Sequence, residues 1–231
     1  MNNITATIAG PLCGLLLLPV TALAQQQSEP ELDVVVGAGL EAHDNALLAN
    51  EEEKSDVERI GSIGLDYTRP SGRVQMDVSY VAERRDYLHD RQDDETALNG
   101  ASAVTWLAVP RLLDFTVFHQ ASQQRVDRRE ADVTSNRETR SVVGAGANLY
   151  GRLTSVDSLV FSPGYTDVNV EGGTGLDSQR ASGALSYVHR TSQVSDLTLT
   201  VSRSAVNTEI EANDYDIDAA TLGYTARLSR L

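Results

Sequence analysis

Residues 74–83 of this chain, Val-Gln-Met-Asp-Val-Ser-Tyr-Val-Ala-Glu, alternate apolar and polar side chains almost without interruption. Val74, Met76, Val78 and Tyr80 fall on one side of an extended chain, and the residues between them fall on the other. This period of two is typical of a β-strand with one apolar face, whereas an amphipathic helix repeats about every 3.6 residues. The stretch therefore predicts a β-strand.

Similar segments occur along the rest of the chain, and their connections alternate in kind. Arg69-Pro70-Ser71-Gly72 is a tight turn, and the acidic stretch 50–56 is a long loop. Long loops on one side and short turns on the other are typical of bacterial outer-membrane barrels, with the loops outside and the turns in the periplasm. Most segments are close to the ~9–11 residues that a tilted membrane strand needs. The predicted strands lie near residues 32–41, 63–69, 74–83, 104–109, 113–119, 140–150, 159–170, 180–190, 197–206 and 217–228.

The sequence thus predicts an all-β fold, an up-and-down antiparallel transmembrane β-barrel of about ten strands. An even number of strands puts both termini on the periplasmic side. The alternative is a secreted β-sandwich or a lipocalin-like barrel, and the low content of Trp and Phe favours it. The regular alternation of loops and turns favours the membrane barrel. The tyrosines that fit a sparse aromatic girdle are Tyr67, Tyr80, Tyr150, Tyr187 and Tyr224.

The first residues predict export. Residues 15–20, Leu-Leu-Leu-Leu-Pro-Val, form an apolar run too short to span a bilayer, and Ala22-Leu23-Ala24 has the small-x-small form of a cleavage site. We interpret residues 1–24 as a secretory signal peptide and residues 25–231 as the barrel domain; the alternative is a membrane anchor. The only cysteine, Cys13, lies in the signal peptide, so the mature chain has neither a disulfide nor a thiolate metal site.

Three stretches, taken in order, resemble one known family over most of the mature chain. They are Leu-Asp-Val-Val-Val-Gly-Ala-Gly-Leu at 32–40, residues 80–87 leading into Asp93-Asp94-Glu95, and Phe-Ser-Pro-Gly-Tyr at 161–165. The chain looks like the PEP-CTERM system-associated outer-membrane β-barrel family. The resemblance implies a barrel of unassigned activity, connected with exopolysaccharide and exosortase gene systems, and it implies no catalytic residue. Members are generally longer, and this chain ends without the usual terminal aromatic residue. Either its barrel-assembly signal is weak or it is the front part of a longer barrel.

The motifs of enzymes are largely missing from the sequence. It has no Gly-x-Ser-x-Gly elbow, no phosphate-binding Gly-x-x-x-x-Gly-Lys and no His-Glu-x-x-His. We therefore expect no enzymatic activity and no resident organic cofactor. The formal net charge of −14 argues against nucleic acid as a partner.

The densest group of charged residues runs from Arg84 to Glu95 and predicts a long outer loop. Its candidate ligands for Ca²⁺ are Asp90, Asp93, Asp94 and Glu95, although their spacing does not follow the EF-hand pattern. Two alternatives remain. The loop is a solvated stretch whose charges neutralise each other, or its carboxylates and His89 activate water at the barrel rim, as in outer-membrane proteases of the omptin type.

The interpretation that combines these features is a monomeric outer-membrane barrel, structural or passively permeable. Its expected partners are outer-membrane lipid and the barrel assembly machinery, and the resemblance adds an association with polysaccharide export. Inward Arg203 or Arg227 is expected to pair with Asp66, Asp77 or Glu83 across the lumen or to contact an acidic polysaccharide.

Overall fold

The computed structural model describes residues 29–45, 55–129, 133–172 and 175–227. The predicted signal peptide, Cys13 and most of the acidic stretch 50–56 lie outside these ranges. Within them, no helix has the length and apolar character needed to cross a bilayer.

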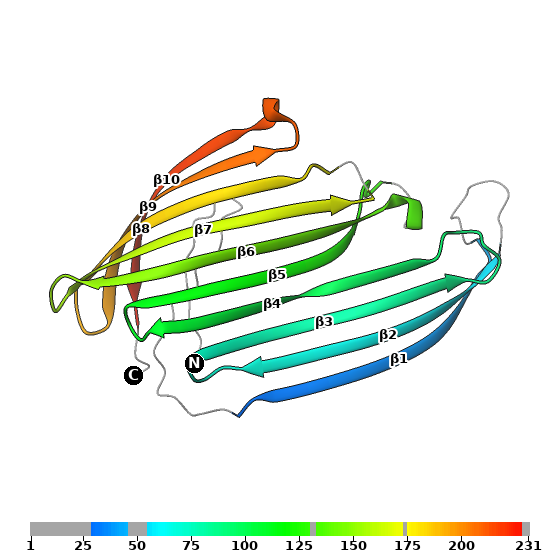
Figure 1. Ribbon diagram of the computed structural model, residues 1–231, viewed down its shortest axis with the longest axis horizontal. Coiled ribbons are helices and arrows are strands. Elements are labelled where there is room, and N and C mark those ends of the chain that lie inside the picture. Colours follow the sequence, from blue (N-terminus) through cyan, green and yellow to red (C-terminus); the bar gives the residue numbers. More distant parts are fainter. Residues whose placement is uncertain (1–28, 46–54, 130–132, 173–174, 228–231) are drawn as a thin grey trace.

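The described chain forms one sheet of ten antiparallel strands, which follow one another in sequence order (Figure 1). This confirms the predicted all-β, up-and-down arrangement. The strands have 12 to 16 residues, and β1 to β9 are longer than the predicted segments. Their bounds are β1 Glu31–His43, β2 Asp56–Arg69, β3 Val74–Tyr87, β4 Glu95–Val109, β5 Leu113–Arg125, β6 Arg137–Arg152, β7 Asp157–Glu171, β8 Ser178–Arg190, β9 Ser195–Thr208 and β10 Tyr215–Ala226.

The connections alternate between short and long, as predicted. We call the two ends of the sheet the turn end and the loop end. At the turn end the connections are 70–73, 110–112, 153–156 and 191–194. At the loop end they are 44–55, 88–94, 126–136, 172–177 and 209–214, and the third and fifth contain the short 3-10 helices η1 (Thr134–Asn136) and η2 (Glu211–Asn213). β1 starts and β10 finishes at the turn end.

The predicted loop from Arg84 to Glu95 is shorter in the structure, because strand pairing continues into it. β3 extends to Tyr87 and β4 begins at Glu95, so the connection is 88–94. The reason is that the charged residues find partners across the strands: Arg84 pairs with Thr96 in the register, and Arg85 pairs with Glu95. Charged side chains at a strand end give no apolar alternation, so the sequence pattern could not reveal this extension.

Cross-strand partners share a side of the sheet, so the register sorts every strand residue onto one of two faces. The apolar face carries, on successive strands, Val36, Ile63, Val78, Val104, Val117, Val143, Phe161, Leu185, Leu199 and Leu222. The polar face carries Asp33, Ser62, Asp77, Thr105, Gln120, Asn148, Ser162, Ser186, Thr200 and Thr221. The predicted alternation of β3 is therefore common to the whole sheet.

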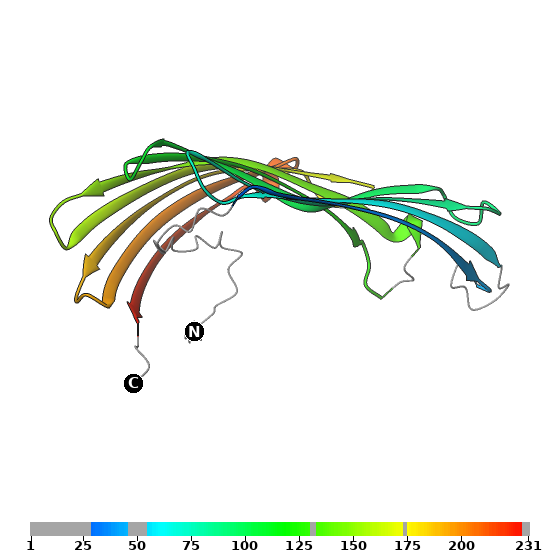
Figure 2. The ribbon, with the colours of Figure 1, turned by 90° about the horizontal axis from the view of Figure 1, so that it is seen from below.

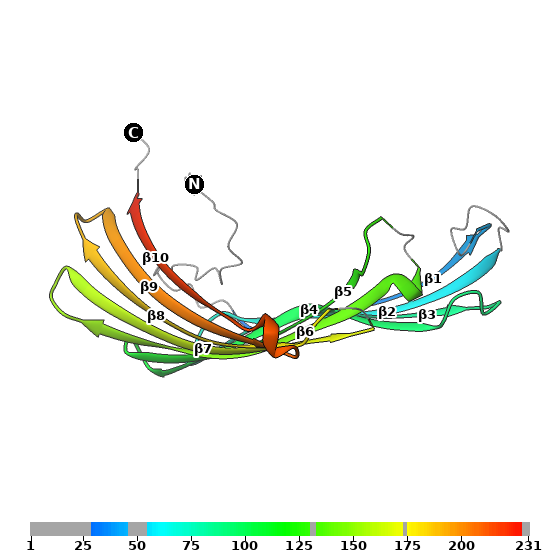
Figure 3. The same ribbon diagram turned by 90° about the horizontal axis from the view of Figure 1, so that it is seen from above.

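The sheet is a single curved and twisted layer (Figures 2 and 3). Within the described residues no second layer packs on it, and the extensive contacts are those between neighbouring strands. Large apolar side chains therefore remain open on the apolar face: Val36 is 76% exposed, Trp106 51% and Leu222 68%. Surfaces in contact with water normally show isolated apolar side chains, whereas here the exposed apolar side chains form one continuous face.

The sheet is open rather than closed into a barrel. β1 and β10 lie at its two edges, and each is hydrogen-bonded to one neighbouring strand. The ten-stranded antiparallel order agrees with the predicted fold, but pairing between the first and last strands is not present in this structure.

Aromatic side chains of the apolar face gather near the turn end. Trp106 and Phe115 are cross-strand partners whose ring centroids lie 5.8 Å apart. The other members of this row are Tyr67, Phe161, Tyr187 and Tyr224. Tyr150, predicted to belong to such a girdle, instead lies on the polar face, where its hydroxyl donates to Asp114 at 2.9 Å.

Candidate functional site

A group of titratable side chains lies at the loop end of β1 and β2, on the polar face. The register places Glu41 directly opposite Glu58 and His43 directly opposite Asp56. Like charges that face each other across two strands destabilise the pair unless a cation lies between them. The site is therefore built around the groups that compensate these carboxylates.

Asp56 is the most buried side chain of the group and fastens the 88–94 connection to β2. Its Oδ1 accepts hydrogen bonds from the amides of Val57 (2.7 Å) and His89 (2.9 Å), and Oδ2 accepts from the amide of Arg91 (3.2 Å). His89 Nδ1 also lies 3.0 Å from Oδ1. Burial raises the pKa of Asp56, but the three amides and the His89 ring outweigh it and hold the pKa below its ordinary value.

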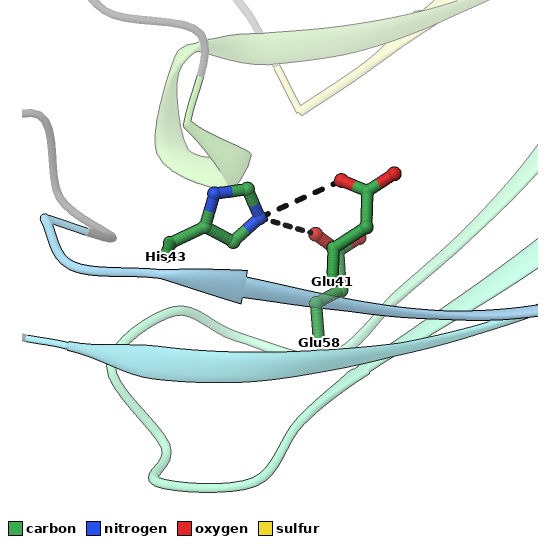
Figure 4. A group of neighbouring side chains, drawn as sticks. All are labelled: Glu41, His43 and Glu58. Atoms are coloured by element: carbon green, nitrogen blue, oxygen red, sulfur yellow. Dashed lines mark hydrogen bonds and ion pairs between the residues drawn. The ribbon is translucent and has the colours of Figure 1, made fainter.

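His43 lies beside the two facing glutamates, and its Nε2 faces both carboxylates (Figure 4). Its Nε2 is 3.3 Å from Glu58 Oε2 and 3.6 Å from Glu41 Oε2. The Glu58 side chain is 4% exposed, and its other oxygen, Oε1, is buried without a hydrogen bond. Arg85 Nη1 lies 3.3 Å from that oxygen as an ion pair, while Arg85 Nε bonds Glu83 at 2.6 Å.

A hollow of about 520 Å³ opens beside these residues. His43, Asp44, Asp56 and His89 line it, together with Ala42, Ser55 and Val57. Both histidine rings therefore face one solvent-open space, and each has a carboxylate partner. In the sequence these residues are far apart, so the sequence alone indicates only His89 as a candidate. The pairing of β1, β2 and β3 brings the others to it.

The four predicted calcium ligands do not form one group. The Glu95 carboxylate is buried, with Arg137 Nη1 at 2.5 Å and the Gln123 amide as its partners. Asp94 accepts from the Tyr87 amide at 3.0 Å and from Arg84 at 3.1 Å. Asp90 and Asp93 are exposed. Among the described residues, the group whose ligand atoms lie close enough to hold one ion is Glu41, His43 and Glu58. Calcium binding at 90–95 stays a prediction.

The 126–136 connection folds against the 88–94 connection beside this site. The amide and hydroxyl of Thr134 both donate to Gln92 Oε1, at 2.8 and 3.1 Å. Tyr87, at the end of β3, is 5% exposed beneath them. Burial and the charge of Glu58 raise the pKa of Tyr87. The loop end is thus ordered by hydrogen bonds between connections, which a freely solvated charged loop would lack.

Comparison with known proteins leaves the site unassigned. No family model, curated protein or solved structure matches this chain. The family resemblance noted in the sequence is therefore neither supported nor opposed by these comparisons, and the assignment must come from the geometry.

A second polar group crosses the middle of the apolar face. The Tyr80 hydroxyl lies 2.7 Å from His119 Nδ1 and donates to Ser102 at 3.0 Å, and His119 Nε2 lies 3.1 Å from Ser141 Oγ. The Tyr80 and His119 rings also stack. Both ring nitrogens of His119 are thus satisfied within the sheet, so the polar group can lie on an apolar surface at limited cost.

Arg203 does not point toward the carboxylates of the polar face, as the sequence suggested. It shares a side with Asp218 in the register and donates to Asp216 on the same side at 2.6 Å. The expected partners Asp66, Asp77 and Glu83 lie on the opposite face. The prediction for Arg203 is wrong. Whether a residue of β9 lies on the same face as a residue of β3 depends on the register of every strand pair between them, and the sequence does not give these registers.

Proposed function

We propose that this chain forms the wall of a bacterial outer-membrane β-barrel that is structural or passively permeable. The observation that carries the proposal is the exposed apolar face, which runs over all ten strands and lies back to back with a polar face. A sheet in contact with lipid on one side and an aqueous lumen on the other has this alternation. A water-soluble sandwich would cover its apolar face with a second layer.

The position of the apolar side chains along the strands supports the same proposal. On β9 the apolar face runs Leu197, Leu199, Val201 from the turn end and then changes to Arg203. The strands of 12 to 16 residues exceed the ~9–11 that a tilted membrane strand needs. Their polar loop-end portions would extend beyond the bilayer, and the aromatic row at the turn end would lie at the other interface.

A membrane location requires partners for both edge strands. An unpaired backbone group in lipid costs several kcal/mol, so membrane-spanning sheets are closed. In the proposed state β1 and β10 therefore pair, either with each other or with further strands. We also propose that residues 1–24 act as a cleaved signal peptide and that the barrel assembly machinery inserts the chain. The resemblance to PEP-CTERM-associated barrels supports an association with exopolysaccharide export.

Membrane fractionation of cells that express the full chain tests the proposal. We expect the protein in the outer-membrane fraction, and we expect boiled and unboiled samples to migrate differently on a gel because the closed sheet resists detergent. Reconstituted into liposomes, the protein is expected to pass small solutes if its lumen is open and to block them if it is purely structural. Recovery as a detergent-free soluble protein would contradict the proposal.

One observation favours a second candidate, a hydrolase at the rim of the sheet. Buried Asp56 holds His89 Nδ1, as an orienting carboxylate does for a general base, and the His89 side chain is 57% exposed beside the hollow. The carboxylate beside His89 is thus Asp56 of β2 and not one of the carboxylates of the 84–95 stretch that the sequence suggested. The test is hydrolysis of peptide and ester substrates by the purified chain. His89→Ala must abolish any activity that His119→Ala leaves intact.

A further inference from the structure

The three side chains Glu41, His43 and Glu58 meet in an arrangement suited to a metal ion. Glu41 and His43 are two residues apart on β1 and therefore share a face, and Glu58 lies opposite Glu41 on β2. One ligand atom from each lies within 4.8 Å of the others. Figure 4 shows both carboxylates turned toward the His43 ring.

The two separations measured from His43 are close to those around a small tetrahedral ion. Ligand atoms about 2.0–2.1 Å from a tetrahedral Zn²⁺ lie roughly 3.3–3.5 Å from one another. His43 Nε2 is 3.3 Å from Glu58 Oε2 and 3.6 Å from Glu41 Oε2. The two distances also exceed the mode of an N–H···O hydrogen bond, about 2.9–3.0 Å, so a single imidazole proton is poorly shared between the carboxylates.

Glu58 supplies an independent observation that points to a missing cation. Only 4% of its side chain is exposed, yet Oε1 accepts no hydrogen bond. Arg85 is the only guanidinium ion-paired to it among the described residues, and Arg85 also pairs with Glu83. Glu58 and Glu83 thus share one guanidinium, and Glu41 is paired with His43. A buried carboxylate in such a negatively charged group is costly unless a further positive charge compensates it.

We propose that Glu41, His43 and Glu58 bind a divalent transition-metal ion of the zinc type. Imidazole together with carboxylate suits Zn²⁺, whereas Ca²⁺ takes six to eight oxygen ligands, which this group does not offer. Glu41 is 58% and His43 40% exposed, so the ion has access from solvent and retains a coordination position for water. The site is distinct from the four carboxylates predicted from the sequence, and it does not depend on a membrane location.

The test is titration of the purified full chain, in detergent if it requires one, with ZnCl₂ by calorimetry and with CoCl₂ by visible absorption. We expect one strongly bound Zn²⁺ per chain, which displaces Co²⁺. Loss of an outer-sphere partner already weakens metal sites by ~10–100-fold, so His43→Ala and Glu41→Gln are expected to weaken binding at least that much. Glu41 is exposed, so Glu41→Gln tests the site without emptying a buried position.

The other histidines provide matched controls. His189→Ala removes a histidine that also pairs with a carboxylate, Asp157, at 2.8 Å, and it lies at the turn end. It is expected to bind Zn²⁺ like the unchanged protein, and so is His89→Ala. Three outcomes would overturn the proposal: no Zn²⁺ binding by the folded chain, unchanged binding by His43→Ala, or displacement of Zn²⁺ by an equal concentration of Ca²⁺.

Discussion

Gly100 is the residue whose replacement the backbone tolerates least. It has a φ of +150°, and a Cβ placed on it would lie 2.1 Å from the Ser79 carbonyl oxygen and 2.6 Å from Tyr80 Cα. The β4–β5 pairing, which starts at Val109 and Leu113 and runs without a register shift from Trp106, ends at Gly100 and its partner Ala121. The glycine therefore allows β4 to approach β3 closely where its pairing with β5 stops.

Gly100→Ala is expected to destabilise the folded sheet by about 1–3 kcal/mol or more, because strain of this kind must be relieved by moving β3 or β4. The measurement is the urea midpoint of the purified protein. Gly61→Ala is the control, since no atom lies within 4 Å of the Cβ it would add. Equal midpoints for the two variants would contradict the close approach described for Gly100.

Asp157 should give the stability of the turn end a specific pH dependence. It accepts hydrogen bonds from Thr154 (2.5 Å) and Tyr187 (2.5 Å), and His189 lies at 2.8 Å. These hydrogen bonds lower the pKa of Asp157 from 3.8 to about 2. The folded state thus favours the carboxylate, so its contribution is complete above the unfolded pKa and is lost as the pH falls from about 4 to about 2.

The stability difference between the unchanged protein and Asp157→Asn is therefore expected to shrink as the pH falls from about 4 to about 2. Chemical denaturation at a series of pH values measures it. Asp196→Asn serves as the control, because Asp196 has one long ion pair, 3.8 Å to Arg190, at the same end of the sheet. A difference that does not shrink between about pH 4 and about pH 2 would contradict the assignment.

The residues of the candidate site show what the sequence could not supply. His89 stood out because charged residues surround it, but its partner Asp56 is 33 residues earlier in the chain. Glu41 lies opposite Glu58 because of the β1–β2 register, and a shift of that register by one residue would separate them. The sequence can indicate a single residue such as His89 as a candidate for acid–base chemistry. Which side chains lie beside it depends on strand pairings that the sequence pattern leaves undetermined.

At the scale of the strand, β3 offers a direct comparison of the two faces. Val78 lies on the apolar face between Tyr67 and Ser102, and Ser79 lies on the polar face beside Asp66. In the proposed membrane state Val78→Arg places a charge in lipid, which costs about 2–4 kcal/mol near the bilayer midplane. Ser79→Arg places the same charge next to a carboxylate.

We therefore expect Val78→Arg to reduce assembly strongly and Ser79→Arg to assemble normally. The heat-dependent gel shift of membrane fractions from cells that express each variant measures the folded share. If both variants assemble equally well, the apolar face does not contact lipid and the proposed function fails with it.

The strand centres were the predictable part of these elements. Apolar residues at every second position mark β3 from Val74 to Ala82 and β9 from Leu197 to Val201. The ends were not predictable, because Arg84–Asp86 of β3 and the start of β4 at Glu95 carry charges on both faces. Ion pairs and the hydrogen bonds of Asp56 extend the sheet there, and neither leaves a periodic signal.

For the whole molecule, the two ends of the sheet should differ in their access to protease. Arg128 and Arg129 are exposed in the 126–136 connection at the loop end, and Arg111 and Arg190 are exposed at the turn end. If the loop end is outside the cell, trypsin added to intact cells is expected to cleave after Arg128 or Arg129 and to leave the turn-end arginines intact. Mass spectrometry of the fragments identifies the sites.

Permeabilising the outer membrane is the control, because it should expose Arg111 and Arg190 to the same trypsin. Cleavage at the turn end in intact cells, with protection of Arg128, would show that the chain is inserted in the reverse direction. Replacing Arg128 and Arg129 by Gln should remove the first cleavage and leave assembly unchanged, since neither residue lies in a strand.

The two open edges also determine how the chain behaves before any membrane surrounds it. β1 has thirteen residues, of which every second one presents its backbone donor and acceptor on the outer side, and Val34, Val35 and Val36 in its middle are each more than half exposed. A long, valine-rich edge of this kind can template strand addition by other chains, which is the first step toward amyloid-like stacking. Glu31, Asp33 and Glu41 on β1, and Asp216 and Asp218 on β10, oppose that stacking by mutual repulsion while they are ionised. Acidic buffers and high protein concentration are therefore the conditions under which this protein should be lost to fibres during purification.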